Sequence, residues 1–202
     1  MISKEQIQDQ ALVLFSKYGL KSVNMDDLAK ELSVSKKTLY QVYSSKEDLV
    51  LSLFEKISSS WDEQVDEILE SLENPMQKFL RFTLLRYQFV KRLNPSFLLR
   101  SGKQYEKVYS YMMNITWNME QIIVGILHQA KEEHQLRSDV NVEVFFNVHE
   151  LIFNAYFEQY NPVVPGSRET FKHMIIAPIA GICEKEEFDI WTEFDSLIST
   201  YN

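Results

Sequence analysis

The sequence is poor in cysteine, glycine and proline, and it has no long apolar run. Among its 202 residues are one cysteine, five glycines and five prolines. A single cysteine, Cys183, excludes an intrachain disulfide framework and a cysteine-based zinc site. So few glycines and prolines argue against sandwiches, barrels and doubly wound folds, because these folds need many tight turns.

No segment has the character of a membrane span or of a secretion signal. The longest stretch without a charged residue, Val108 to Met119, has twelve residues, whereas a membrane-spanning helix needs about 18. The first residues, Met-Ile-Ser-Lys-Glu-Gln, lack the apolar centre of a signal peptide. We therefore expect a soluble, cytoplasmic protein with no membrane partner.

Charge is distributed unevenly along the chain. Residues 1–50 carry seven basic and seven acidic side chains, whereas residues 51–202 carry fourteen basic and twenty-two acidic ones, which is the whole net charge of −8. An acidic body repels nucleic acid, so a contact with DNA has to come from a local cationic surface in the first part.

Apolar residues recur at helical spacing from end to end, with no alternating strand pattern, and this predicts an all-α protein. Asn24, Ser35, Ser45 and Asn74 are placed as helix N-caps. After three short N-terminal helices the predicted helices cover Ser45 to Leu69, Met76 to Leu93, Lys103 to His134, Val142 to Tyr160, Ser167 to Cys183 and Phe188 to Ile198.

The first fifty residues have the pattern of a helix-turn-helix module, in which the second helix enters the DNA major groove with residues near its N-terminus. That helix begins Ser-Lys-Lys-Thr at residue 35. Leu39 and Val42 are predicted to pack inward, and the tyrosine hydroxyls can reach phosphates. Lys46, beside the free amides of the next helix, is a second candidate anion site. The alternative is that these lysines are an ordinary solvated face of a helix bundle.

The segments Gly19 to Ala29, Val34 to Tyr40 and Ser45 to Leu49 resemble the N-terminal signature of the tetracycline-repressor (TetR/AcrR) family. The resemblance covers about the first 55 residues in order, spacing and residue type. It implies a homodimeric bacterial transcriptional regulator, usually a repressor that a small ligand releases from a palindromic DNA operator. The candidate DNA-binding residues are Asn24, Ser35, Lys36, Lys37, Thr38, Tyr40, Gln41, Tyr43 and Lys46.

The sequence departs from the family pattern at three places in this module. Leu32-Ser33 replaces the usual Ala-Gly of the turn, so we expect Ser33 to be mildly strained or the turn to differ. Lys37 replaces a frequent glycine, and Gln41-Val42-Tyr43 replaces His-Tyr-Phe. The operator sequence therefore cannot be copied from a relative.

The resemblance implies two domains: residues 1–48 as a three-helix DNA-binding domain and residues 49–202 as a helical ligand-binding and dimerisation bundle. Two C-terminal segments, residues 142–160 and 171–182, are too apolar for surface helices. Because such helices need a cover on most sides, we predict that they form the dimer interface. Its candidate residues are Phe145, Ile152, Tyr156, Phe171, Ile175 and Ile179.

The middle helices are rich in tyrosine, methionine and tryptophan, which suit a pocket for a flat or greasy ligand. Simple core packing is the alternative for each residue, and a satisfied core histidine is the alternative for His149. The candidate ligand-binding residues are Phe82, Arg86, Tyr109, Met112, Met113, Thr116, Trp117, His149 and Phe153.

Residues 55–73 are strongly acidic and residues 75–107 strongly basic. Inter-helix ion pairs are the simpler explanation, and an inward Arg81, Arg86 or Arg100 that receives an anionic ligand is the other.

The four histidines are scattered, and no nucleophile triad, metal-spaced cluster or glycine-rich phosphate loop is present. We therefore expect no enzyme, no cofactor and no metal. Three functions stay open: a ligand-responsive regulator, a regulator controlled by a protein partner or constitutive, and, more remotely, a helical enzyme.

Overall fold

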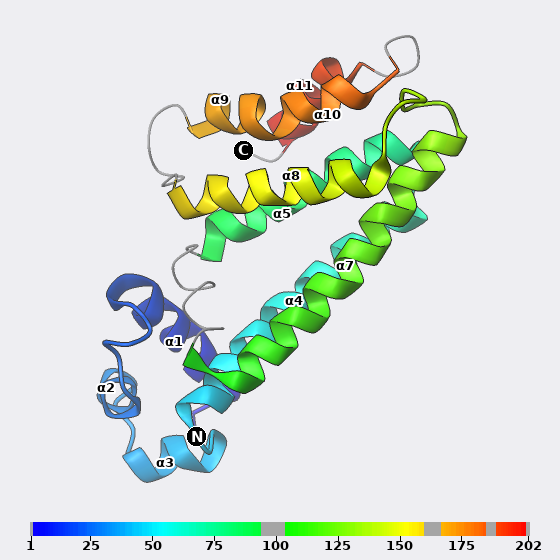
Figure 1. Ribbon diagram of the computed structural model, residues 1–202. Helices are drawn as coiled ribbons and strands as arrows, with labels where there is room; N and C mark the ends of the chain where they lie inside the picture. The colour runs from blue at the N-terminus through cyan, green and yellow to red at the C-terminus, as the bar shows by residue number, and fades with distance from the viewer. Residues whose placement is uncertain (1, 94–103, 160–166, 185–188, 201–202) are drawn as a thin grey trace. The chain divides into compact units, whose positions relative to one another are not determined.

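A computed structural model of the protein describes residues 2–93, 104–159, 167–184 and 189–200 (Figure 1). These residues form helices joined by turns, together with one isolated antiparallel bridge between Leu136 and Cys183, so the all-α expectation is confirmed. The helices are α1 (Lys4–Tyr18), α2 (Met25–Glu31), α3 (Lys36–Val42), α4 (Lys46–Glu70), α5 (Pro75–Leu93), α7 (Glu106–Glu132), α8 (Val142–Gln159), α9 (Ser167–Phe171), η1 (Lys172–Ile176), α10 (Ala177–Ile182) and α11 (Ile190–Thr200).

The chain divides into two compact units. The N-terminal unit consists of Met1–Gln64 with Arg92–Thr116, and the C-terminal unit consists of Val65–Lys91 with Trp117–Asn202. Helices α4 and α7 each contribute residues to both units. The functional boundary that we expect at residue 48 falls at the start of α4 and remains a prediction.

Side-chain caps set the starts of the first three helices. Ser3 and Gln6 form a capping box at α1, and the side-chain carbonyl oxygen of Asn24 accepts hydrogen bonds from the amides of Asp26 and Asp27, both at 2.9 Å. The Asp27 carboxylate accepts the Asn24 amide in return, also at 2.9 Å. The predicted N-cap at Asn24 is confirmed, and the structure extends it to a capping box. Such caps stabilise a helix by about 1 kcal/mol each, which matters most for helices as short as α2 and α3.

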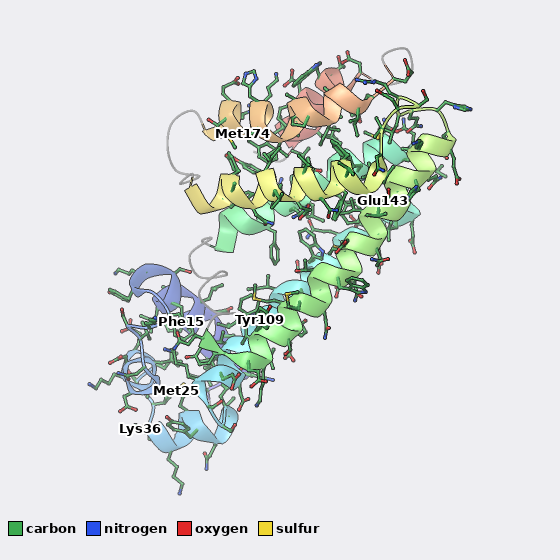
Figure 2. The ribbon with its side chains drawn as sticks, in the orientation of Figure 1. Phe15, Met25, Lys36, Tyr109, Glu143 and Met174 are labelled. Atoms are coloured by element: carbon green, nitrogen blue, oxygen red, sulfur yellow. The ribbon has the colours of Figure 1, made fainter. Side chains whose placement is uncertain are left out.

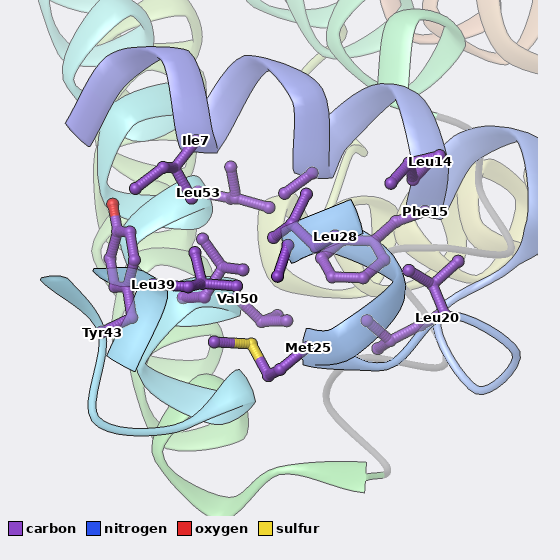
Figure 3. Packing of buried hydrophobic residues seen from close by; sticks show 14 of the residues in the cluster. Ile7, Leu14, Phe15, Leu20, Met25, Leu28, Leu39, Tyr43, Val50 and Leu53 are labelled. Atoms are coloured by element: carbon purple, nitrogen blue, oxygen red, sulfur yellow. The ribbon is translucent and has the colours of Figure 1, made fainter. Parts of the chain in front are cut away.

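The N-terminal unit is built around an aliphatic core (Figure 3). Leu28 from α2 and Leu39 from α3 meet Leu49 and Leu53 from α4, and all four are almost completely buried. Val108 of α7 belongs to the same buried cluster. This core holds α3 against the rest of the unit by apolar burial, at roughly 2 kcal/mol per large side chain.

The turn between α2 and α3 contains the strain that the sequence leads us to expect. Ser33 has a φ of 53°, in the left-handed region that favours glycine. Its amide donates to the carbonyl of Lys30 at 3.0 Å, and the amide of Val34 donates to the carbonyl of Ala29 at 3.0 Å. These two bonds close α2 and direct the chain into α3.

The core of the C-terminal unit is aromatic. Phe79 and Phe82 of α5, Phe153 and Tyr156 of α8, and Phe194 of α11 are among its most deeply buried side chains. The ring centroids of Phe153 and Phe157 are 4.9 Å apart, a distance typical of packed aromatic pairs.

The segment predicted as one helix from Ser167 to Cys183 changes helix type in its middle. Residues 172–176 form a π-turn in which the amide of Ala177 donates to the carbonyl of Lys172. Pro178 follows at once, and a proline cannot donate to the carbonyl four residues earlier and would clash with it in a regular α-helix. The wider turn accommodates this defect, and such turns are common near functional sites.

None of the helices in the described ranges combines the length and apolar character that crossing a bilayer requires.

Candidate nucleic-acid interface

Helix α3 has a buried side and an exposed side. Leu39 and Tyr43, four residues apart, both belong to the aliphatic core, and Figure 3 shows Tyr43 at its edge. The side chains of Lys37, Tyr40 and Gln41 are exposed. A helix that is anchored on one side and polar on the other can present its polar side to a DNA groove.

The start of α3 is fixed by its own hydroxyl groups. The Ser35 hydroxyl accepts the amide of Thr38 at 3.0 Å and pairs with the Thr38 hydroxyl at 2.7 Å. In the part of the chain that the structure describes, no protein hydrogen bond engages the side chains of Tyr40 or Gln41. The Tyr40 hydroxyl and the Gln41 amide are therefore available to hydrogen-bond a base edge. The hydroxyls of Ser35 and Thr38 already bond to each other.

The two lysines at the start of α3 differ. Lys36 pairs with the carboxylate of Asp26 on α2, and its position at the start of α3 is marked in Figure 2. The hydrogen bond that Lys36 donates to Asp26 raises the pKa of this lysine above its usual value. Lys37 is exposed and has no ion-pair partner within the described ranges. Of the two lysines predicted to offer a positive charge to DNA, Lys36 is therefore paired within the protein, and Lys37 has no such partner among the described residues.

Two expectations for α3 need correction. Tyr43 is only 4% exposed, and burial raises the pKa of its phenol, so its hydroxyl is not available to a phosphate here. Val42, expected inside, is 36% exposed. Tyr43 is the C-cap of α3, where the backbone becomes extended, and its side chain is buried with Leu39 in place of Val42.

Lys46 and Asn24 are also engaged within the protein. The Lys46 ammonium donates to the carbonyl of Leu20 and lies 5.4 Å from the centre of the Phe15 ring. Burial lowers its pKa. The expected phosphate contact of Lys46 would require this side chain to leave its partner, and the side-chain carbonyl oxygen of Asn24 is occupied by the cap of α2.

In the C-terminal unit the structure brings together three of the candidate ligand-binding residues, Arg86, His149 and Phe153, and Phe82 is completely buried in the same unit. His149 is almost completely buried, and neither ring nitrogen has a hydrogen-bond partner among the described residues. Its ring centroid lies 5.6 Å from that of Phe79 and 6.5 Å from that of Phe153. His149 is therefore a core residue, as the alternative to ligand binding predicted. Its ring nitrogens, however, have no hydrogen-bond partner among the described residues.

Charge near His149 is balanced. The Arg86 guanidinium forms two hydrogen bonds with the Glu150 carboxylate, one of them at 2.8 Å, and lies 4.0 Å from the centre of the Phe153 ring. Burial, and secondarily the charge of Arg86, lowers the pKa of His149 to about 4, so this imidazole is neutral at pH 7.

Ion pairs also account for Arg81, which contacts Glu73 at 3.0 Å. The simpler interpretation of the charge pattern, with arginines paired inside the protein, therefore describes both Arg81 and Arg86. Arg100 lies outside the described residues.

The other ligand candidates lie along α7. Tyr109, Met113, Thr116 and Trp117 are exposed, and Met112 packs against the core of the N-terminal unit. The Thr116 hydroxyl donates to the carbonyl of Met112 at 2.9 Å. The ring contacts of His149 within the described ranges are with phenylalanines of α5 and α8, and none of these α7 side chains is among them.

The predicted dimer residues are corrected most strongly. Tyr156, Phe171, Ile175 and Ile179 are completely buried inside a single chain, and Phe145 and Ile152 are half-buried. A completely buried side chain cannot touch a second subunit. The prediction of a helix here is confirmed, but many of the apolar side chains of α8 belong to the core of a single chain.

A different side of α8 carries exposed apolar side chains that the sequence pattern did not single out. Val144, Val148 and Leu151 are 59%, 49% and 70% exposed and follow each other at spacings of four and three. We call these three residues the α8 apolar stripe. In the sequence, only the excess of apolar residues on this helix pointed to such a stripe. That excess does not show which side of the helix faces the core and which faces outward.

Across the described residues, no group of three or more histidine, cysteine, aspartate or glutamate side chains is arranged to hold a metal ion. Burial raises the pKa of the Cys183 thiol to about 12, so it is inert at neutral pH.

These features define a helix-turn-helix DNA-binding protein. Residues 7–53 match the family model described as bacterial regulatory proteins of the tetR family, so the expected resemblance of this module to the TetR/AcrR family is confirmed.

Full-length relatives agree with this assignment. The chain is 24% identical over 174 residues to the helix-turn-helix regulator YvaF of Bacillus subtilis, covering 83% of this chain and 90% of that protein. It is 18% identical to the transcriptional repressor KstR2 of Mycobacterium tuberculosis, covering 90% and 92% of the two chains. These relatives are transcriptional regulators and not enzymes, so the expectation of a non-enzymatic, DNA-binding regulator is confirmed.

Solved structures share the fold. The KstR2 structure, described as a ketosteroid transcriptional regulator, superposes with a TM-score of 0.71 at 18% identity and covers 90% of this chain and 95% of that one. A putative regulator from Saccharomonospora viridis in complex with choline gives a TM-score of 0.76 at 18% identity, covering 90% and 98%.

Proposed function

We propose that this protein is a cytoplasmic, homodimeric, ligand-responsive transcriptional repressor that binds a palindromic operator through α3. The observation that carries the DNA contact is the two-sided character of α3. Leu39 anchors the helix in the aliphatic core, while Lys37, Tyr40 and Gln41 project a cation, a hydroxyl and an amide outward. An amide pairs well with adenine, and a lysine pairs with guanine or phosphate.

The α8 apolar stripe supports a dimer. Val144, Val148 and Leu151 are apolar, exposed and aligned on one helix. A second copy of the same chain can cover such a stripe through a two-fold interface, in which each stripe meets its counterpart. Two DNA-binding modules held in fixed relation then match half-sites one or more helical turns apart.

The architecture of α7 supports a response to ligand. Val108 is part of the core around α3, and the Lys107 ammonium contacts Asp48 of α4 at 2.8 Å. The Lys107 amide also donates to Glu47 at 3.0 Å. The same continuous helix extends into the C-terminal unit. A ligand that favours one arrangement of the C-terminal residues of α7 therefore has a covalent route to the DNA-binding core.

We place the ligand site at His149 and its neighbours Arg86 and Phe153. The support is a buried imidazole with two unsatisfied nitrogens, since buried polar groups in proteins are normally hydrogen-bonded. A ligand with a polar group and an apolar body would satisfy both the imidazole and its aromatic surroundings.

A second candidate function is a regulator that senses no small molecule and responds to a protein partner. It is favoured by the close aromatic packing of the C-terminal unit, where the ring centroids of Tyr87 and Phe171 are 4.2 Å apart. A ligand screen by thermal shift separates the two, because a specific small molecule raises the melting temperature of the first kind of protein only.

The DNA contact is tested with one matched pair of lysines. A duplex is first selected from a random library with the wild-type protein. We expect Lys37→Ala to weaken binding to it and to reduce the salt dependence by about one phosphate contact. The control is Lys17→Ala, an exposed lysine in the last turn of α1. Equal effects of the two substitutions would contradict the proposed surface.

Base reading is tested at Gln41. We expect Gln41→Ala to lose about 1–3 kcal/mol of discrimination at one operator position. If selection with this variant returns the wild-type site at full stringency, Gln41 does not read a base.

A further inference from the structure

The first lysine of α3 is held by an acidic residue of the neighbouring helix. The side chains of Lys36 and Asp26 are 60% and 45% exposed, so the ion pair lies on the surface and not in the core. Asp26 belongs to the first turn of α2, and its amide is bound by the Asn24 cap. The Asp26 carboxylate, in contrast, points to α3.

The cap of α2 does not need this carboxylate. Asp27 already returns the capping-box hydrogen bond to the Asn24 amide at 2.9 Å. A first-turn acid also interacts with the helix dipole, but Asp27 supplies that charge as well. The contact with Lys36 is therefore what distinguishes Asp26 from Asp27.

The ion pair changes what Lys36 offers to DNA. A lone ammonium neutralises a phosphate of any sequence and releases a counterion, which strengthens binding to all DNA. A lysine paired with a carboxylate has no net charge to offer, and the carboxylate repels the phosphates nearby. The ammonium still has three N–H donors, so it can keep Asp26 and donate to O6 and N7 of a guanine.

We propose that Asp26 is a specificity-determining residue of this regulator, because it cancels the attraction of Lys36 for phosphate and leaves its hydrogen bonds for a base. This inference rests on the proposed function, in which α3 enters the major groove. Asp26 acts through Lys36, as a positioning residue that favours operator over random DNA.

The test compares Asp26→Asn with wild type on two duplexes of equal length, the library-selected operator and a random sequence. We expect the variant to bind random DNA roughly two- to fivefold more tightly, the range of an exposed ion pair. Operator affinity changes less, so the specificity ratio falls. The slope of log K against log salt for random DNA becomes steeper by about 0.9 for each freed lysine.

The matched control is Glu31→Gln, which removes the same charge from the other end of α2. We expect it to change the specificity ratio and the salt slope less than Asp26→Asn. Asp26→Glu, which keeps the charge, should stay close to wild type. Thermal unfolding of each variant without DNA verifies that the module is folded.

A second comparison isolates the pair. In a Lys36→Ala background, Asp26→Asn should alter the specificity ratio no more than Glu31→Gln does. An equal effect of Asp26→Asn with and without Lys36, or equality with Glu31→Gln in the wild-type background, overturns the inference. If Lys36→Ala, Lys37→Ala and Gln41→Ala all leave DNA affinity unchanged, the proposed α3 surface fails, and the inference fails with it.

Discussion

The two units of the chain use different interiors. The N-terminal unit buries aliphatic side chains such as Leu28, Leu39 and Leu53, with its charged groups at the surface or at helix ends. The C-terminal unit buries Phe79, Phe153 and other aromatic rings, and among its described residues it encloses a histidine without a hydrogen-bond partner. Among the described residues, the N-terminal interior has one unsatisfied hydroxyl, that of Tyr43, whereas the C-terminal interior has an imidazole, that of His149, with both ring nitrogens unsatisfied.

This difference shows where each function can reside. An aliphatic core fixes the position of α3, and the buried hydroxyl of Tyr43 lies at the edge of that core rather than inside it (Figure 3). An aromatic core with a buried imidazole leaves an energetic deficit, since an unsatisfied buried polar group costs about 1–3 kcal/mol. A bound molecule that forms a hydrogen bond with this imidazole would remove that cost and bind more tightly as a result.

The largest expected effect comes from a charge inside the aromatic unit. Ile175→Asp places a carboxylate at a completely buried position on η1. We expect it to destabilise the C-terminal unit by more than about 4 kcal/mol, because the charge has no partner there. Limited proteolysis and near-UV circular dichroism should report an unfolded C-terminal unit. A folded variant that is merely monomeric would return Ile175 to the dimer interface.

The next effect separates the dimer from the core. Val148→Asp lies on the exposed α8 apolar stripe, and we expect it to leave the fold intact while weakening the dimer. The loss is about 2 kcal/mol or more, because both copies carry the charge. Analytical ultracentrifugation measures the dissociation constant, and operator affinity should fall with it.

The matched control for this experiment is Val13→Asp. Val13 on α1 is 57% exposed, close to the 49% of Val148, but it does not lie on α8. If both variants remain dimers to the same concentration, the subunits meet elsewhere.

An effect of similar size is expected from the pH dependence of His149. Its pKa is about 4 in the folded protein and 6.5 for an unperturbed imidazole, so the unfolded chain binds more protons between these values. Stability contributed by the neutral imidazole is therefore present above pH 6.5 and is lost as the pH falls toward 4. The full change is about 3 kcal/mol.

Denaturant unfolding at several pH values between about 7 and 4 measures this loss. His149→Phe should abolish most of it, because phenylalanine does not titrate and suits the aromatic surroundings. An identical pH profile for wild type and variant would mean that the folded protein protonates His149 normally.

The smallest effect concerns the turn before α3. Ser33 has a positive φ, so Ser33→Gly should relieve strain and stabilise the N-terminal unit by about 0.5–1 kcal/mol, partly offset by the entropy of glycine. Equilibrium unfolding measures the gain, with Ser22→Gly as the control in the preceding loop. A loss of stability in Ser33→Gly greater than in the control would show that the turn is not strained.

Features of the site that depend on residues close together in the sequence could be predicted, whereas features that depend on more distant residues could not. Caps at Asn24 and Ser35 were predicted, and so was strain at Ser33 as one of two alternatives, because each depends on residues within a few positions. The inward positions of α3 were only half right, since Leu39 is buried but Tyr43, rather than Val42, accompanies it. The pairing of Lys36 with Asp26 was missed, because it joins residues ten positions apart across a turn.

By itself, the sequence determined the helical class, the order and the approximate limits of the helices, and the family of the DNA-binding module. These follow from periodicity, caps and local turn chemistry, which act within one or two helical turns. Only the tertiary structure decided which side of an over-apolar helix is core. On α8, Tyr156 is buried and Leu151 exposed, although both are large and hydrophobic. Burial depends on which distant helix packs against a given face, and the composition of one helix does not show which helix that is.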